Sequence, residues 1–101
     1  MSERVDYYIS GIRKRGEHIT HLRVHKALAD NSFAPHGIVQ PRSMAVVNMM
    51  SKSMVYKVLH QENGRVRPGE VVHLVELGNR FYLKTSSEGA PQDDLGGLPS
   101  F

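Results

Sequence analysis

Histidine is the residue type in this chain best suited to bind a metal ion, and three of the six histidines lie close together, at His18, His21 and His25. On a β-strand each residue rises about 3.3 Å, so His21 and His25 share a face but lie about 13 Å apart. One ion would need both nitrogens within about 2 Å. His18 points to the opposite face from His25 unless a bulge intervenes. Because the chain also has no cysteine, we expect no metal site and no cofactor.

Patterns typical of an active site are also missing from the sequence. The acidic residues are scattered over predicted turns and the C-terminal tail, so no acid–base pair is evident. No serine lies in a Gly-x-Ser-x-Gly sequence, and no glycine-rich phosphate loop occurs. His73 stands among valines and a leucine, as structural strand histidines do. We therefore expect a protein that is not an enzyme and has no catalytic residues.

Basic residues gather on the first predicted hairpin and form the first candidate binding site. They are Arg13, Lys14, Arg15, Arg23 and Lys26. A basic β-ribbon can follow a phosphate backbone, and Tyr7 and Tyr8 at its base offer aromatic rings for stacking. The alternative is a solvated hairpin whose charges protect a sheet edge or meet the acidic tail. Both interpretations remain open at this stage.

A methionine-rich helix is the second candidate site, with Met44, Met49 and Met50 as candidate partner-binding residues. Met44, Val47, Met50 and Met54 recur close to helical spacing and therefore predict one stripe, which Val46 and Met49 widen. Methionine fills irregular cores and also forms adaptable binding surfaces. The alternatives are packing of this stripe against the sheet, and a face for a partner or a second copy of the chain.

The elements that position these residues follow from turn signals and apolar spacing. Residues 7–14 and 18–25 predict a hairpin around Gly16, with a bulge near Gly11 because apolar residues in each arm are three apart. Ser43 is the expected N-cap of a helix over 44–52, which we expect to be buried on more than one side.

The second half of the chain predicts strands. Residues 54–60 form one strand, Asn63-Gly64 and residues 67–70 form turns, and residues 71–76 pair with 80–85 as a second hairpin. A short strand over 37–40 is also possible. The expected fold class is α+β, with a small antiparallel sheet of about five strands in two hairpins covered by one α-helix.

Composition indicates one small domain over residues 1–101. Val, Ile, Leu and Phe supply 26 of the 101 residues, enough for a core. Residues 1–84 hold all 13 Lys and Arg and seven of the ten acids, so a basic body precedes an acidic tail. We expect that tail, residues 86–101, to dock through Leu95 and Leu98, the alternative being a mobile peptide ligand. No apolar segment is long enough to span a membrane, so we expect a cytoplasmic protein.

Both ends of the chain carry a resemblance to a known family. The first hairpin has basic residues, a polar loop and His18-Ile19, and the end has Tyr82-Leu83-Lys84-Thr85 followed by Asp93-Asp94-Leu95 and Leu98-Pro99. With the capped central helix, these motifs resemble a widespread bacterial family of small domains of unknown function. The resemblance covers most of the chain except about residues 27–42. It implies a compact small fold and a bacterial or phage origin, and it implies no reaction.

We therefore expect a non-catalytic protein-binding or adaptor module that acts through the methionine-rich helix or the tail. The alternative is a nucleic-acid-associated protein that binds the phosphate backbone through the basic first hairpin. An unknown protein partner is favoured over nucleic acid, and a homodimer is possible.

Overall fold

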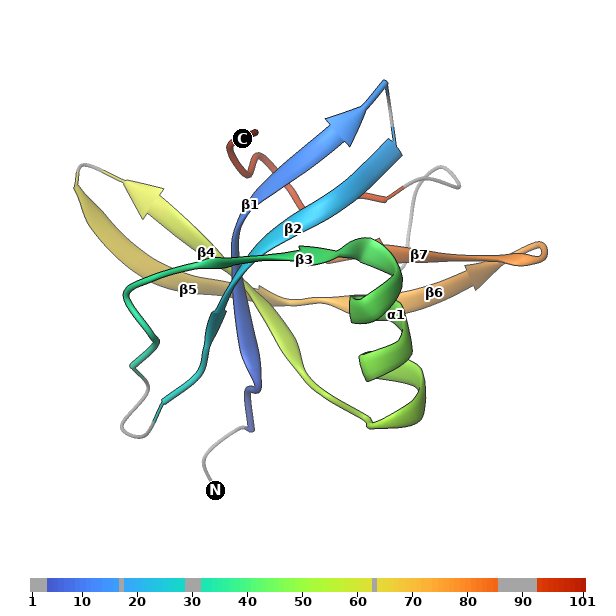
Figure 1. Cartoon of the computed structure of the whole chain (residues 1–101), viewed down its shortest axis with the longest axis horizontal. Helices are drawn as coiled ribbons and strands as arrows, with labels where there is room; N and C mark the ends of the chain where they lie inside the picture. The colour runs from blue at the N-terminus through green and yellow to red at the C-terminus, as the bar shows by residue number, and fades with distance from the viewer. Residues whose placement is uncertain (1–3, 17, 29–31, 63, 86–92) are drawn as a thin grey trace.

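A computed structural model of the chain describes residues 4–16, 18–28, 32–62, 64–85 and 93–101. One helix and seven strands occur in this part of the chain, which confirms the α+β class. In chain order the elements are β1 (Tyr7–Arg15), β2 (His18–Lys26), β3 (Ile38–Pro41), α1 (Arg42–Ser51), β4 (Tyr56–Glu62), β5 (Arg65–Val71), β6 (His73–Leu77) and β7 (Arg80–Lys84) (Figure 1).

The strands form two sheets. Five of them lie in the order β3-β2-β1-β4-β5, and β6 pairs with β7 as a separate antiparallel hairpin (Figure 1). The pairing of β1 with β4 is parallel, with Tyr7 opposite Tyr56 and Ile9 opposite Val58. The larger sheet is therefore mixed, whereas the sequence analysis expected an antiparallel one. The reason is the connection through α1, which leads from β3 to β4. It brings β4 to the side of β1 opposite to β2, and β4 then runs in the same direction as β1.

The first hairpin forms as the sequence predicts. Gly16 in its turn has a φ of 66°, which favours glycine. The pairing of β1 with β2 shifts register between Ile9 and Gly11, so the expected bulge is confirmed. A second shift lies between Arg13 and Lys14. These shifts keep Ile9 and Ile12 in the core although they are three residues apart.

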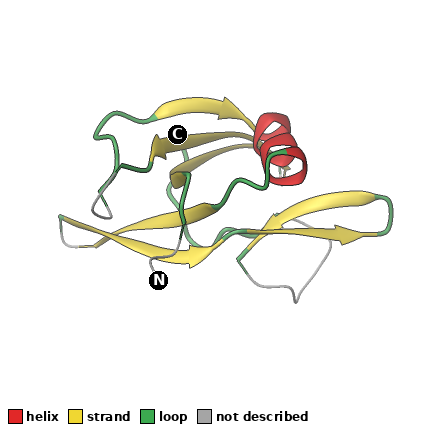
Figure 2. Cartoon of the chain, turned by 90° about the horizontal axis from the view of Figure 1, so that it is seen from below, coloured by secondary structure: helices red, strands yellow, loops and turns green. Residues whose placement is uncertain are grey.

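The start of α1 differs from the expectation. The helix begins at Arg42 with Pro41 as its N-cap residue, and no side chain caps it by a hydrogen bond, so Ser43 is not the N-cap. Proline has a fixed φ near −65° and no N–H, and it ends β3 while allowing a helix to begin directly after it. Figure 2 shows the helix at one end of the upper layer, with a second layer of strands beneath it.

Residues 67–70 are not a turn, as the sequence analysis expected, but part of strand β5. Pro68 pairs opposite Leu59, and β5 is the last strand of the sheet, where a proline is tolerated. Gly69 lies so close to its neighbour that an added Cβ would be 2.5 Å from the His60 ring. The glycine is therefore required by close packing within a strand rather than by a turn.

The core lies between the two sheets, the helix and the end of the chain. It includes Ile9, Leu22 and Val24 from the first hairpin, Tyr56 and Val58 from β4, Leu83 from β7, and Leu95 and Leu98. Residues 93–101 run along the strands: Ser100 bridges to Ile12, and Asp94 bridges to Lys84. The expected docking of residues 86–92 lies outside the described residues.

Candidate functional site

The helix α1 presents an apolar stripe outward. Met44, Val47 and Met50 have exposed fractions of 50%, 52% and 51%. They fall at i, i+3 and i+6 and therefore share one face of the helix. On the other side, Ala45 and Asn48 are buried. The expectation that the helix is buried on more than one side is therefore wrong, and the stripe is a surface feature.

The inward side of α1 combines apolar contacts with a buried polar group, Asn48. Asn48 donates a hydrogen bond to the Tyr56 hydroxyl (3.0 Å), and that hydroxyl donates to Oε1 of Gln40 (2.7 Å). Burial raises the pKa of Tyr56, so the neutral, donating phenol is favoured. Ala45 contributes only a methyl group to the core. This face fixes the helix by hydrogen bonds and close approach.

The three methionines proposed from the sequence do not all lie together. Met44 and Met50 belong to the exposed stripe, but Met49 is partly buried and packs against the core. Val47, which was not among the candidate partner-binding residues, lies between Met44 and Met50 and is equally exposed. The exposed stripe therefore contains Val47 and does not contain Met49.

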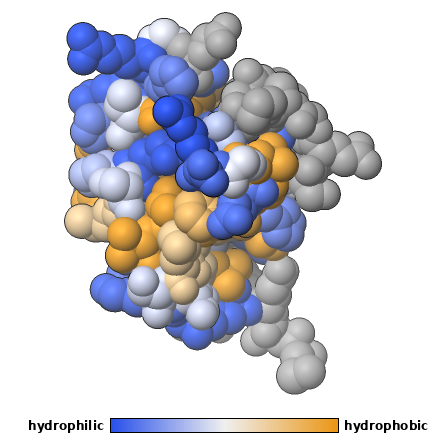
Figure 3. All heavy atoms as spheres, turned by 90° about the vertical axis from the view of Figure 1, so that its right-hand side faces the viewer, coloured by the Kyte–Doolittle hydropathy of each residue, from blue (hydrophilic) through white to orange (hydrophobic). Residues whose placement is uncertain are grey.

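Strand β3 adds to the exposed apolar residues. Ile38 and Val39 have exposed fractions of 57% and 50%, and the strand leads directly into α1. β3 pairs with β2 on one side and is the end of the sheet on the other. We call the set Ile38, Val39, Met44, Val47 and Met50 the α1–β3 surface. Figure 3 shows the side of the molecule on which α1 lies, where orange and pale orange spheres gather in one patch.

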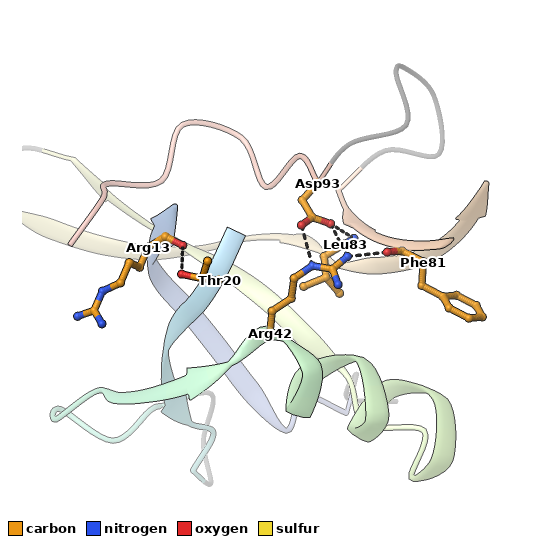
Figure 4. Close-up of polar contacts among 6 residues, drawn as sticks. All are labelled: Arg13, Thr20, Arg42, Phe81, Leu83 and Asp93. Carbon is orange, nitrogen blue, oxygen red and sulfur yellow. Dashed lines mark hydrogen bonds and ion pairs between the residues drawn. The ribbon is translucent and has the colours of Figure 1, made fainter. Parts of the chain in front are cut away.

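A bidentate ion pair holds the start of α1 in place. The Arg42 guanidinium donates to both carboxylate oxygens of Asp93, at 2.7 and 2.9 Å, and to the Phe81 carbonyl at 2.5 Å (Figure 4). Asp93 also accepts the backbone N–H of Leu83 at 2.9 Å. The hydrogen bond with Asp93 raises the pKa of Arg42. The helix is thus tied to β7 and to the end of the chain.

The five basic residues of the first hairpin are spread along its length. Lys14 and Arg15 lie at the tip, whereas Lys26 pairs with Tyr7 at the other end. With a rise of about 3.3 Å per residue, the two ends are about 25 Å apart. Arg13 and Arg23 share a different neighbour: their guanidinium carbons lie 4.8 and 4.5 Å from the centre of the Phe101 ring.

The aromatic residues at the base of this hairpin contact other rings of the fold. Tyr8 is buried, and its ring lies 5.8 Å from that of Phe33. Tyr7 stacks on the buried Tyr56 at 5.3 Å between ring centres. The expectation that Tyr8 offers a stacking surface is wrong, because its ring is buried beside Phe33.

The sequence analysis missed one pair, Ser10 and His25. Ser10 Oγ lies 2.7 Å from Nε2 of His25, and Nδ1 of His25 lies 2.8 Å from the Ala34 carbonyl oxygen. The two residues are 15 apart in sequence, on different arms of the hairpin. The available signal was the predicted bulge near Gly11, because a bulge turns the side chain beside it.

The described residues contain no group of three or more His, Asp or Glu side chains able to hold a metal ion. In the same part of the chain, no helix is long and apolar enough to cross a membrane. Comparison of the sequence with protein families and with curated proteins, and of the fold with solved structures, finds no match.

Proposed function

We propose that this protein binds another protein through the α1–β3 surface. The observation that carries the proposal is the outward stripe of Met44, Val47 and Met50, next to a strand with two further exposed apolar residues. Apolar side chains exposed singly are ordinary, but a gathered set marks an interaction site. Methionine suits such a surface because its flexible thioether adapts to different shapes.

The chemistry of the partner follows from β3. An end strand presents unpaired backbone N–H and C=O groups that a strand of another chain can pair with. Ile38 and Val39 point to opposite faces of the strand, so an added strand meets apolar side chains on both faces. We infer that the partner supplies an extended segment with apolar side chains, which pairs along β3 and covers the stripe on α1.

Binding of nucleic acid by the first hairpin has less support. The five basic residues are spread over both ends of the hairpin, and Tyr8 is buried. Arg13 and Arg23 lie over the Phe101 ring. A phosphate-binding hairpin needs its cations together and free to meet the backbone. Loss of affinity at raised salt would identify this function, since phosphate contacts release counterions.

The test places a photo-cross-linking amino acid at position 47 in cells of the source organism. The matched control carries the same amino acid in place of Val66, an exposed apolar residue on β5. We expect an adduct from position 47 that position 66 does not give, with the cross-link mapped to an apolar segment of the partner. Addition of Val39→Lys should lower the yield of the adduct, because a charge then lies among the apolar side chains on one face of the paired strands.

Sedimentation of the purified chain separates a second copy from a different partner. A dimer that is weakened by Val47→Asp and unchanged by Val66→Asp identifies the partner as the same chain. Equal adducts from positions 47 and 66, or none from position 47 together with a monomer in sedimentation, would overturn the proposal.

A further inference from the structure

Ser10 occupies the bulge in β1. Ile9 pairs with Val24 and Gly11 pairs with Arg23, so Ser10 is the extra residue between two paired positions. A bulge re-aims the side chain of its extra residue, and bulges are enriched beside active sites. Here the Ser10 hydroxyl points to β2 and lies 2.7 Å from Nε2 of His25.

The second hydrogen bond of His25 fixes where its proton lies. Nδ1 is 2.8 Å from the Ala34 carbonyl oxygen, which can only accept, so Nδ1 carries a hydrogen. In the neutral ring, Nε2 then has a lone pair and accepts the Ser10 O–H. The ring is also held edge-on to Phe33, with ring centres 5.7 Å apart. Ser10, His25 and the Ala34 carbonyl are thus arranged as nucleophile, base and orienting group.

Both side chains line a cavity of about 430 Å³. Its walls include apolar residues, Phe33, Leu59 and Val66 among them, and its titratable lining residues are Arg23, His25 and His36. This volume, with polar side chains such as Arg23 and Gln61 beside the apolar ones, suits a small organic molecule that carries a polar group. Arg23 is held in the wall on two sides: a Cβ on Gly37 would lie 2.6 Å from its Cγ, and the Phe101 ring faces its guanidinium.

We propose that Ser10 is a nucleophile activated by His25, and that it takes up the acyl group of a small ester bound in this cavity. Ser10 Oγ attacks the ester carbonyl carbon while its proton passes to Nε2 of His25. The carbon–oxygen bond of the ester then breaks, and the leaving alkoxide takes that proton and departs as an alcohol. Water, activated in the same way, hydrolyses the acyl-serine and releases a carboxylic acid.

The charges around the cavity agree with this chemistry. Negative charge develops on the ester carbonyl oxygen during attack and needs hydrogen-bond donors or cations nearby. All the titratable residues that line the cavity are bases, and Arg23 among them carries a guanidinium group. The imidazolium formed at His25 is stabilised by its hydrogen bond to the Ala34 carbonyl. The proposal is independent of binding at the α1–β3 surface.

The test uses phenylmethylsulfonyl fluoride, an electrophile that attaches to activated serines with loss of fluoride. Intact mass and peptide mapping of the full chain should find an adduct at Ser10, formed much faster than at the exposed Ser43 and Ser53. His25→Gln should slow labelling of Ser10 about 100-fold or more, the effect of losing a general base. His73→Gln, which changes an exposed imidazole that does not line this cavity, is the matched control and should label within a fewfold of the parent.

A merely structural role gives a different result. In that case Ser10→Ala and His25→Gln lower the melting temperature because each removes a hydrogen bond of this pair, but the parent chain shows no preferential adduct at Ser10. Labelling of Ser10 no faster than of Ser43 and Ser53 overturns the proposal. If His25→Gln fails to fold, the rates of labelling of Ser10, Ser43 and Ser53 in the parent chain still test whether Ser10 is activated.

Discussion

The two end strands of the five-stranded sheet, β3 and β5, are built in opposite ways. β5 carries Arg65, Arg67 and Pro68, and its pairing with β4 is irregular between Lys57 and Leu59. Charges, proline and bulges are the means by which proteins prevent an edge from pairing with other chains. β3 has exposed Ile38 and Val39 instead, and its protection is limited to its short length and the terminal Pro41.

The strands also differ in how they are attached. β3 is fixed through buried polar contacts: Gln40 accepts from Tyr56, and the adjoining Arg42 is paired with Asp93. The exposed, open strand is therefore held from behind by buried polar contacts. A surface that binds a partner benefits from this, because a fixed strand loses little conformational freedom on binding.

The largest expected effect comes from breaking the ion pair behind this surface. Asp93→Asn should lower the free energy of unfolding by about 2–4 kcal/mol, because Arg42 keeps its charge in a half-buried site without its partner carboxylate. Urea denaturation measures the change. Asp94→Asn, at the exposed neighbouring acid, is the control and should cost less than about 0.5 kcal/mol. Equal effects of the two changes would show that the pair does not hold α1.

The next effect concerns Tyr56, which links β3 to α1. Tyr56→Phe should cost about 1–2 kcal/mol, because Gln40 and Asn48 each lose a buried hydrogen-bond partner. The change should also alter the alkaline stability. Burial raises the pKa of Tyr56 in the fold, so its contribution is complete below the unfolded pKa of about 10 and is lost as pH rises through the folded value.

Urea denaturation between pH 8 and pH 11.5 measures this difference. The parent should lose stability above about pH 10 more steeply than Tyr56→Phe, with an added slope of at most about 1.4 kcal/mol per pH unit. Parallel curves for the two proteins would mean that the phenol ionises equally in the folded and unfolded chains.

Local sequence signals predicted much of the fold and little of the site. The positive φ of Gly16, the bulge near Gly11 and the hairpin of β6 with β7 follow from nearby residues. The partner of Arg42 is 51 residues away, so no local pattern reveals it.

Local sequence patterns also could not predict that the methionine stripe faces outward. An apolar stripe predicts only that one face of the helix contacts apolar groups. The same pattern is found in helices that pack on a core and in helices that bind a partner. Which face is buried depends on Asn48, whose buried partner Tyr56 lies on a strand paired with β1. Likewise, the proximity of Ser10 and His25 depends on the register of two strands as well as on the bulge.

A third prediction compares the two end strands directly. Val39→Lys should weaken partner binding about tenfold, since it places a charge where an apolar segment is expected to pair. Val66→Lys makes the same change on β5 and should leave the affinity unchanged within about twofold. Both valines are substantially exposed, so both variants should keep stabilities within about 0.5 kcal/mol of the parent. Isothermal titration calorimetry with the partner identified by cross-linking measures the affinity. Equal losses of affinity in the two variants would show that the two edge strands do not differ in partner binding.

The smallest effect on stability is expected from removing the protection of β5. Arg67→Val combined with Pro68→Val gives this strand apolar side chains and restores one backbone N–H, as in β3. Both positions are exposed, so the free energy of unfolding should change by no more than about 0.5 kcal/mol. Self-association should nevertheless increase, because a strand edge without charge or proline pairs with other chains.

Light scattering as a function of protein concentration measures the self-association, and Arg80→Val on the separate hairpin is the control for an added apolar residue. If both variants associate equally, exposed apolar area alone causes the effect, and Arg67 and Pro68 do not protect the edge.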